Sequence, residues 1–289
     1  MKKWSKALAW QLLSLILLAI FGGLVSATLV RYSPGYGVDE RELDPRLTSS
    51  SVEALRAQRR SHEDLIGYYA QYLKGIAHGD LGISESLQRP ISQVLQERFP
   101  VTLRSVLAAI VTAWVAAFSL GIWGLFARDW MFELSTTLST GFLLSLPSAV
   151  IALIFVYLHA PVFLAIAVVT FPKLFRFVRN LLLHTAEQPH VLAARARGVG
   201  KIRVLTHHVI SPVAPSLLAL LGLSISLAFG AAVPIEALCD SAGIGQLAWY
   251  AAINRDLPLI TSLTLFVTLI TVASTSLSEH ASKFLARSA

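Results

Sequence analysis

Charged side chains are scarce in this chain. Asp, Glu, Lys and Arg together make up 14% of the 289 residues, whereas hydrophobic residues make up 55%. A water-soluble domain averages about 25% charged residues, because its surface must face water. The composition therefore excludes an ordinary soluble protein and indicates a chain that lies mostly in a membrane.

Cysteine and the common catalytic motifs are lacking as well. Cys239 is the only cysteine, so no intrachain disulfide can form. The chain has no His-Glu-x-x-His, no Gly-x-Ser-x-Gly and no cysteine cluster. A phosphate-binding loop requires Ser or Thr after Gly-Lys, but Gly200-Lys201 is followed by Ile202. We therefore expect no metal site, no bound cofactor, no ATP site and no enzymatic activity in this chain.

What is present is an excess of basic residues, with a net charge of +7. Such a balance often indicates nucleic-acid binding. Here the basic residues gather beside long apolar runs, which is the pattern that orients a membrane protein. We therefore expect contact with membrane lipid and no binding of nucleic acid.

The first apolar run, Leu8–Val30, follows a basic start and is long enough to span a membrane, which takes about 20 helical residues. A secretory signal peptide is the alternative, with Val25-Ser-Ala27 as its cleavage site, but its apolar core is usually only about 7–15 residues long. We favour an uncleaved first transmembrane helix in residues 1–30. Residues 31–100 carry nine basic and ten acidic residues, and we expect them to form an external loop region.

The remaining residues, 101–289, contain further apolar runs that predict a membrane-embedded core of about five more helices. A break at His159-Ala160-Pro161 divides the longest run, since proline interrupts a helix. The expected fold is all-α, a polytopic membrane protein of about six transmembrane helices. The basic clusters fall on one side, which places both termini in the cytoplasm. The core spans are expected at Val101–Ala127, Leu134–Leu158, Pro161–Val178, Val213–Val233 and Leu259–Leu277.

Three motifs interrupt the apolar pattern. The first is Gly79-Asp-Leu-Gly82-Ile-Ser84, in which the glycines permit a tight turn and Asp80 can accept hydrogen bonds from backbone amides. It is followed by Arg89-Pro90-Ile91 and by Glu97-Arg-Phe-Pro-Val-Thr102-Leu. A structural turn is the simpler interpretation of the first block, and substrate contact is the alternative.

The second motif, His190–Pro212, is basic, rich in alanine and helical in pattern, with an interruption at Gly198. Glycine is the usual residue where a helix ends in a left-handed turn. The motif either anchors the adjacent spans on the cytoplasmic side or holds a partner there.

The third motif is Gly243-Ile-Gly245, followed by Ala251-Ala-Ile-Asn254-Arg255-Asp256-Leu-Pro258. It lies in Pro234–Pro258, which we expect to be an outer, glycine-containing loop. Irregular backbone at membrane depth persists only where protein covers it or where it lines a cavity. A segment of the transport gate and a plug between helices both fit this pattern.

In this order the motifs resemble those of the dipeptide/oligopeptide/nickel ABC-importer permease family, over nearly the whole chain. The resemblance implies a pore-forming subunit in the bacterial cytoplasmic (inner) membrane, importing peptides or a similar small solute. It also implies a second homologous permease subunit, two ABC ATPase subunits and an extracytoplasmic solute-binding protein as partners. ATP and Mg would be bound by the ATPase subunits.

The resemblance also implies roles for particular residues. Residues 184–212 correspond to the "EAA" loop that couples the permease to the ATPases, where Ala193 and Ala194 allow close approach and Leu192 replaces the usual Glu. The coupling residues are Leu192, Ala193, Ala194, Arg195, Gly198 and His208. The external or gate residues are Gly79, Asp80, Gly82, Glu236, Gly243, Gly245, Asn254, Arg255 and Asp256.

The main alternative is a secondary, ion-coupled transporter. Transporters of that class usually bury ionisable residues near the middle of the membrane. The centres of the expected spans contain almost no Asp or Glu, which favours the ABC permease. A membrane-embedded enzyme is a third possibility, against which stands the lack of a catalytic set.

Overall fold

The structure is a computed structural model that describes residues 78–127 and 129–288, together with residues 17, 21, 24, 25, 28, 72, 74 and 75. Most of the expected first span and most of the expected external region lie outside the described residues. The helices are α4 (Ile91–Ala127), α5 (Trp130–Ser145), α6 (Ser148–Tyr157), α7 (Val162–Ala186), α8 (Pro189–Ala196), α9 (Lys201–Arg203), the π-helical segment η2 (Val204–Ile210), α10 (Ser211–Leu238), α11 (Ile244–Ile253) and α12 (Leu257–Ser288).

The all-α fold is confirmed, and the long helices fall where the apolar runs predict them. Among the described residues, three continuous helices are long and apolar enough to cross a membrane: Ile91–Phe126, Lys201–Leu238 and Leu257–Ala286. The first begins ahead of the expected Val101 and continues through Pro100. α7 corresponds to the expected fourth span and carries three basic residues, Lys173, Arg176 and Arg179.

The expected span Leu134–Leu158 is not one continuous helix. It is divided into α5 and α6, which are bent by 96° relative to each other. Pro147 explains the break, since a residue before proline is forced out of the helical region and Leu146 has φ −79° and ψ 128°. The second break is as expected, because α6 ends before His159, whose φ is +51°, and α7 begins after Pro161.

The expected outer loop Pro234–Pro258 is mostly helical. α10 continues to Leu238, and the short apolar helix α11 occupies Ile244–Ile253 before α12 starts at Leu257. Only the connections on either side of α11 are irregular. The glycines Gly243 and Gly245 therefore lie at the start of a helix.

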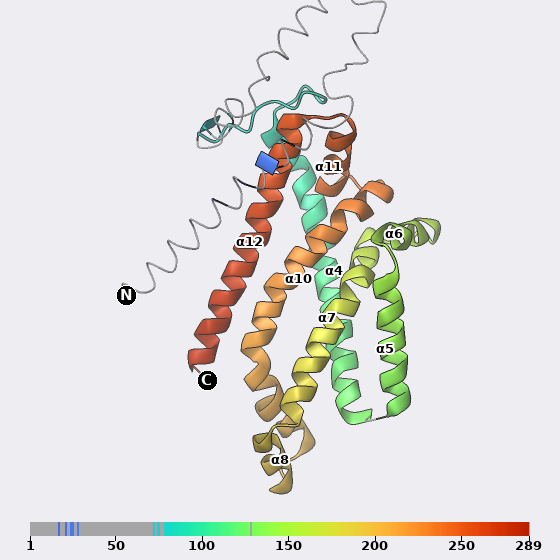
Figure 1. Cartoon of the computed structure of the whole chain (residues 1–289), viewed down its shortest axis with the longest axis vertical. Helices are drawn as coiled ribbons and strands as arrows, with labels where there is room; N and C mark the ends of the chain where they lie inside the picture. Colours follow the sequence, from blue (N-terminus) through green and yellow to red (C-terminus); the bar gives the residue numbers. More distant parts are fainter. Residues whose placement is uncertain are drawn as a thin grey trace, which may run out of the picture. The chain divides into compact units, whose positions relative to one another are not determined.

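The described helices belong to two compact units. One comprises residues 99–246 and 270–289, the other residues 1–98 and 247–269. In the first unit α7 and α10 run side by side and form the centre of the core (Figure 1). Small residues such as Ala165, Ala167, Ala228 and Ala232 are fully or almost fully buried there, which lets the two helices approach closely.

The outward faces of the same unit are apolar. Val111, Val115 and Trp123 of α4 are each more than half exposed, as are Leu138 and Phe142 of α5. Contiguous exposed apolar surface of this kind is unfavourable in water and is typical of a lipid or subunit contact. The packing therefore agrees with a membrane-embedded chain.

Candidate functional site

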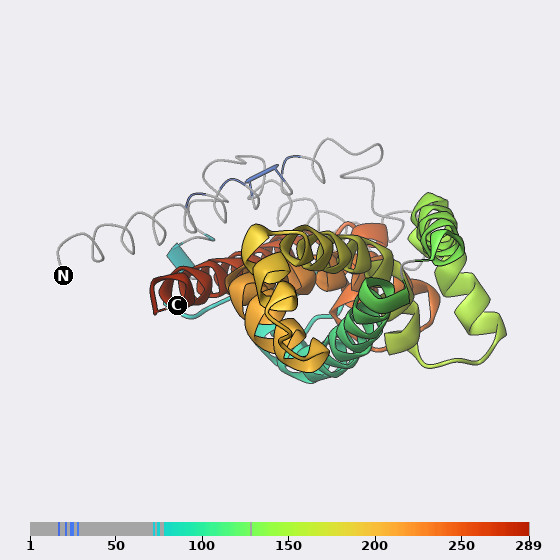
Figure 2. The same ribbon diagram turned by 90° about the horizontal axis from the view of Figure 1, so that it is seen from below.

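The basic segment after α7 forms a compact helical hairpin. α8 follows α7 directly, Arg197 ends it, and Gly198 turns the chain with φ +77°. The chain then enters α9 and η2, which run without a break into α10. Figure 1 places α8 beyond the ends of α7 and α10, and Figure 2 shows this end of the unit from below. The left-handed turn expected at Gly198 is confirmed.

Apolar contacts and one hydrogen bond hold this hairpin together. Val191 and Ala194 of α8 are fully buried, and Val204 and Val209 of η2 belong to the same core. His190 Nε2 donates a hydrogen bond to the backbone carbonyl oxygen of His208 at 3.1 Å. His208 thus contributes its backbone to the hairpin. α8 and η2 thus pack against each other, and η2 continues into α10.

The outer face of the hairpin is exposed. Leu192 is 51% exposed, and Ala193 and Arg195 are exposed beside it. Ala194 is different, because its side chain faces the core of this chain and has no exposed surface. The expectation that Ala194 lets a partner approach is therefore wrong. On a helix, residues 193 and 194 point about 100° apart, so only one of two adjacent alanines can face outward.

The exposed face is positively charged. Arg195, Lys201 and Arg203 are exposed, and no Asp or Glu occurs between Pro189 and Ile210. None of the three has an ion pair within the described part of the chain. Arg197 Nε instead donates to the carbonyl oxygen of Ala193 at 3.3 Å, which places this cation at the C-terminus of α8. A cation is favourable there because of the helix dipole.

The first and third motifs meet at Asp256. Its Oδ2 accepts hydrogen bonds from Ser84 Oγ at 2.5 Å, Ser86 N at 2.9 Å and Ser86 Oγ at 2.6 Å. Its Oδ1 accepts from Leu259 N at 3.0 Å, so the same carboxylate caps the N-terminus of α12. Asp256 is 1% exposed and Ser84 is fully buried. Asp256 thus joins two segments that are far apart in the sequence.

The glycine turn beside this joint is as expected. Gly79 and Gly82 have φ values of +82° and +78°, and Gly82 N donates to Asp80 Oδ1 at 2.8 Å. The neighbours of Asp256 behave differently from it. Asn254 and Arg255 are exposed; Asn254 Nδ2 donates to the carbonyl oxygen of Tyr250 at 2.8 Å, and Arg255 has φ +53°. Both residues belong to the turn between α11 and α12.

Glu236 organises the start of α11. It is fully buried, and its Oε2 accepts hydrogen bonds from Thr102 Oγ1 at 2.9 Å and Gly245 N at 2.7 Å. Ile244 N donates to Thr102 Oγ1 at 2.7 Å. A Cβ added to Gly243 would collide with both side chains, and one added to Gly245 would stand 2.7 Å from Val233 Cα. Both glycines are therefore required for close packing.

The sequence motifs did not indicate a role for Ser84, Ser86 or Thr102, the partners of Asp256 and Glu236. Ser84 and Thr102 lie within the first motif and the segment that follows it, but their hydrogen-bond partners are distant in the sequence. Ser86 lies outside both segments. The one available signal for Thr102 is a polar residue at the start of a long apolar run. Buried polar groups need hydrogen-bond partners, so this signal indicates a contact without identifying it.

Comparison with known proteins decides the family. Residues 109–289, more than half of the chain, match the family model described as "Binding-protein-dependent transport system inner membrane component". The chain belongs to this family. It is 27% identical to a protein of Brucella suis that is named as a peptide transport system permease, covering 77% of this chain and 79% of that protein. It is 25% identical to the nickel import system permease protein NikB of Staphylococcus aureus, covering 91% and 85%.

Family membership determines the general function. The chain is the pore-forming permease subunit of an ABC importer, a multi-pass membrane protein that works with ATPase and binding-protein partners. This decides against a secondary, ion-coupled transporter. Permease subunits of this family lack an ATPase of their own, in agreement with the incomplete phosphate-binding motif at Gly200.

Proposed function

We propose that the hairpin formed by α8, Gly198, α9 and η2 is the surface that binds the ATPase subunits. The observation that carries this proposal is that one face of α8 is buried against its own chain and the other is exposed. Val191 and Ala194 fasten the helix to its own chain, whereas Leu192, Ala193 and Arg195 remain exposed. A rigid helix with an exposed cationic face suits an acidic groove on a partner, and it would move as a unit when the ATPases close.

Movement of this hairpin has a direct route into the membrane. η2 continues into α10 without a loop, and α10 packs along α7 over much of its length. A displacement of the coupling face would therefore tilt both helices together. The spans would alternate between inward-open and outward-open states, each favoured by different partners.

At the other end of α10, we propose that the start of α11 is part of the gate. Glu236 of α10 and Thr102 of α4 each accept one hydrogen bond from the backbone of Gly245 or Ile244, so two hydrogen bonds attach α11 to these helices. A third hydrogen bond joins Thr102 to Glu236. In this proposal a tilt of α10 is transmitted to α11. Asp256 and the turn around Gly79–Gly82 have a structural role, because their polar groups bond to each other.

The substrate we propose is a peptide or a nickel complex, the solutes in the names of the two relatives described above. The complex would contain a second homologous permease, two ABC ATPases that bind ATP and Mg, and an extracytoplasmic solute-binding protein. No cofactor is expected in this chain. Both termini would lie in the cytoplasm of a bacterial inner membrane, in agreement with the basic hairpin on that side.

The coupling face can be tested by cross-linking. Cys239 would first be replaced by alanine, and the assembled transporter with Leu192→Cys would then be treated with a short thiol-reactive cross-linker. We expect a cross-link to the ATPase, whose yield changes when ATP is added. Ala194→Cys is the matched control, two positions away with no exposed surface, and should give no cross-link. Equal yields at both positions would refute the assigned face.

The substrate needs a separate measurement. The solute-binding protein of the transporter would be titrated with short peptides and with nickel chelates, followed by uptake into vesicles that contain the full transporter. Uptake of one class would identify the substrate. Uptake of neither would contradict the proposed substrate while leaving the coupling face untouched.

A further inference from the structure

A polar pocket opens between α5 and α7, apart from the coupling hairpin and the outer motifs. It has a volume of about 180 Å³. Its wall contains three threonines, two arginines and an asparagine, with a single apolar residue: Thr136, Thr137, Thr140, Phe175, Arg176, Arg179 and Asn180. A pocket of this composition is unexpected beside the exposed apolar side chains of α4 and α5.

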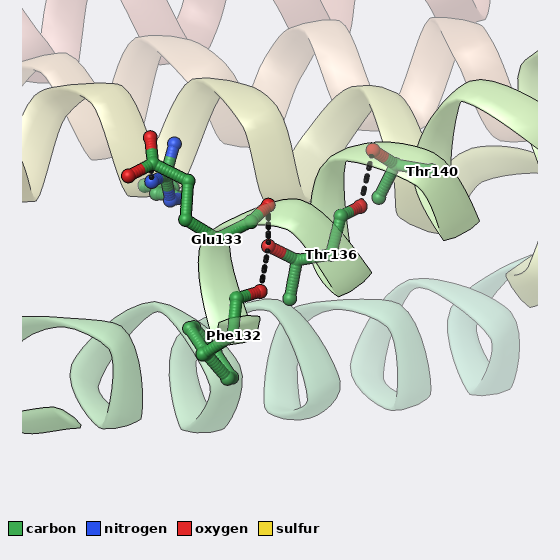
Figure 3. A network of polar contacts seen from close by, with 5 residues as sticks. Phe132, Glu133, Thr136 and Thr140 are labelled. Atoms are coloured by element: carbon green, nitrogen blue, oxygen red, sulfur yellow. Dashed lines mark hydrogen bonds and ion pairs between the residues drawn. The ribbon is translucent and has the colours of Figure 1, made fainter. Parts of the chain in front are cut away.

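The spacing of these residues places them on facing helix surfaces. Residues 176, 179 and 180 are three and four apart on α7, so their side chains share one face. Glu133, Thr136 and Thr140 follow one another along α5 in the same way, as Figure 3 shows. Thr136 Oγ1 donates to the carbonyl oxygen of Phe132 at 2.8 Å, and Thr140 Oγ1 donates to that of Thr136 at 2.8 Å. The hydroxyl oxygens remain able to accept.

The two arginines differ in their hydrogen-bond and ion-pair partners. Arg179 forms an ion pair with Glu133 at 3.0 Å. Arg176 Nε has only a long hydrogen bond, 3.4 Å, to Thr140 Oγ1, and no ion pair within the described residues. The Glu133 side chain is 65% exposed, so it stands at the rim of the pocket rather than inside it. The pocket thus offers a guanidinium without an anion.

The positions of Arg176 and Arg179 along α7 indicate how deep in the membrane the pocket lies. With 25 residues α7 is about 38 Å long, longer than the hydrocarbon core of about 30 Å. Counted from Val162, Arg176 lies about 21 Å and Arg179 about 26 Å along the helix. Both therefore lie in the half of α7 that is nearer the coupling hairpin, with Arg179 closer to that end of the helix than Arg176. A guanidinium at this depth is unfavourable unless it reaches the interface or finds an anion.

We propose that this pocket binds the phosphate group of an anionic phospholipid from the leaflet on the hairpin side. The phosphate would accept hydrogen bonds from Arg176 and from the amide of Asn180, while the acyl chains would lie along the exposed apolar faces of α5. A guanidinium provides paired donors that match phosphate oxygens. Basic pockets between helices on the cytoplasmic side suit anionic headgroups in general. The leaflet assignment rests on the proposed topology.

The test uses the full-length chain in nanodiscs of phosphatidylcholine with or without phosphatidylglycerol, and measures the retained lipid by native mass spectrometry. We expect selective retention of phosphatidylglycerol. Arg176→Gln should lower this retention about tenfold, as expected for loss of a charge-assisted hydrogen bond. Arg176→Lys, which keeps the charge but not the paired donors, should lower it less. Glu133→Gln should raise retention, because it removes the competing carboxylate and releases Arg179.

Lys283→Gln is the matched control. It removes the same charge from an exposed residue of α12 that does not line the pocket, so retention should not change. Equal losses in Arg176→Gln and Lys283→Gln would mean diffuse attraction to the membrane surface and would overturn the proposal. So would equal retention of both lipids. If inorganic phosphate stabilises the chain in pure phosphatidylcholine as well as phosphatidylglycerol does, the pocket binds a free anion and not a lipid. None of these measurements requires ATPase coupling, so they are independent of the proposed coupling face.

Discussion

Ser84 Oγ donates a hydrogen bond to Asp256 Oδ2 across 172 positions of sequence, at a distance of 2.5 Å. The same carboxylate caps α12 through Leu259 N. The glycine turn of the first motif and the start of the last helix are thus fixed to each other by one side chain. Because Ser84 is buried, loss of Asp256 removes the acceptor of its hydroxyl. Loss of Ser84 would leave Asp256 with its hydrogen bonds from Ser86 and Leu259.

The first prediction concerns this contact. Asp256→Ala should lower the free energy of unfolding by about 2–4 kcal/mol, since it removes a helix cap and leaves the Ser84 hydroxyl without its acceptor. Chemical denaturation in detergent would measure the change, and a double-mutant cycle with Ser84→Ala should show clear coupling. Asp240→Asn is the control, as Asp240 is an exposed acid whose φ of +50° Asn tolerates. Additive effects of the two substitutions would show that the bond contributes little.

The second prediction concerns the start of α11. Gly243→Ala should destabilise the chain by about 1–3 kcal/mol, because the new methyl group would displace the Glu236 carboxylate from its donors. Gly230→Ala is the control: no heavy atom lies within 4 Å of the added Cβ, and alanine favours a helix. A thermal shift assay on both variants would compare them. Similar melting temperatures would contradict the close packing.

The third prediction concerns Gly198 and distinguishes the effect of its positive φ from the effect of the room available for a side chain. A Cβ at Gly198 would meet nothing within 4 Å, so only its φ of +77° opposes a side chain. Gly198→Val should strain the turn by about 1–2 kcal/mol and uncouple substrate-stimulated ATP hydrolysis without unfolding the spans. Gly200→Val, at an ordinary φ of −59° and with equal space, should leave coupling intact. Normal coupling in Gly198→Val would argue against the docking role.

The fourth prediction compares two neighbouring cations. Arg195 is exposed on the proposed docking face and has no acidic partner in the described chain, whereas Arg197 bonds to Ala193 of its own helix. Arg195→Ala should weaken binding of the ATPase by about 2–5 kcal/mol, the typical cost of removing one interfacial charge. Arg197→Ala should weaken it by less than about 1 kcal/mol. Co-purification of the ATPase would measure both changes. Equal small losses of ATPase binding would mean that the basic residues of the hairpin only orient the chain in the membrane.

The fifth prediction concerns topology. A reporter fused after Ala289 should report the cytoplasm, and one inserted near Ser50 should report the external side, because the basic clusters retain their loops in the cytoplasm. Alkaline phosphatase and green fluorescent protein fusions provide complementary signals. Signals from the same side at both positions would overturn the topology.

Local patterns predicted the local features of this protein. Gly79, Gly82 and Gly198 have positive φ as expected, because glycine alone adopts that region at little cost. Proline interrupts a helix, and this local rule predicted the break at His159–Pro161. The break before Pro147 also follows from proline, because the residue before it leaves the helical region. It was not predicted, because it lies inside an apolar run whose length suggested one helix.

The sequence by itself determined that the chain is an all-helical membrane protein of this permease family, because hydropathy, charge placement and glycine turns depend on residues close together in the chain. Only the tertiary structure decided that Asp256 binds Ser84, that Glu236 holds the start of α11, and that Ala194 faces inward while Ala193 faces out. Each of these features depends on tertiary contacts between segments that are distant in the sequence, and composition and periodicity do not specify such contacts.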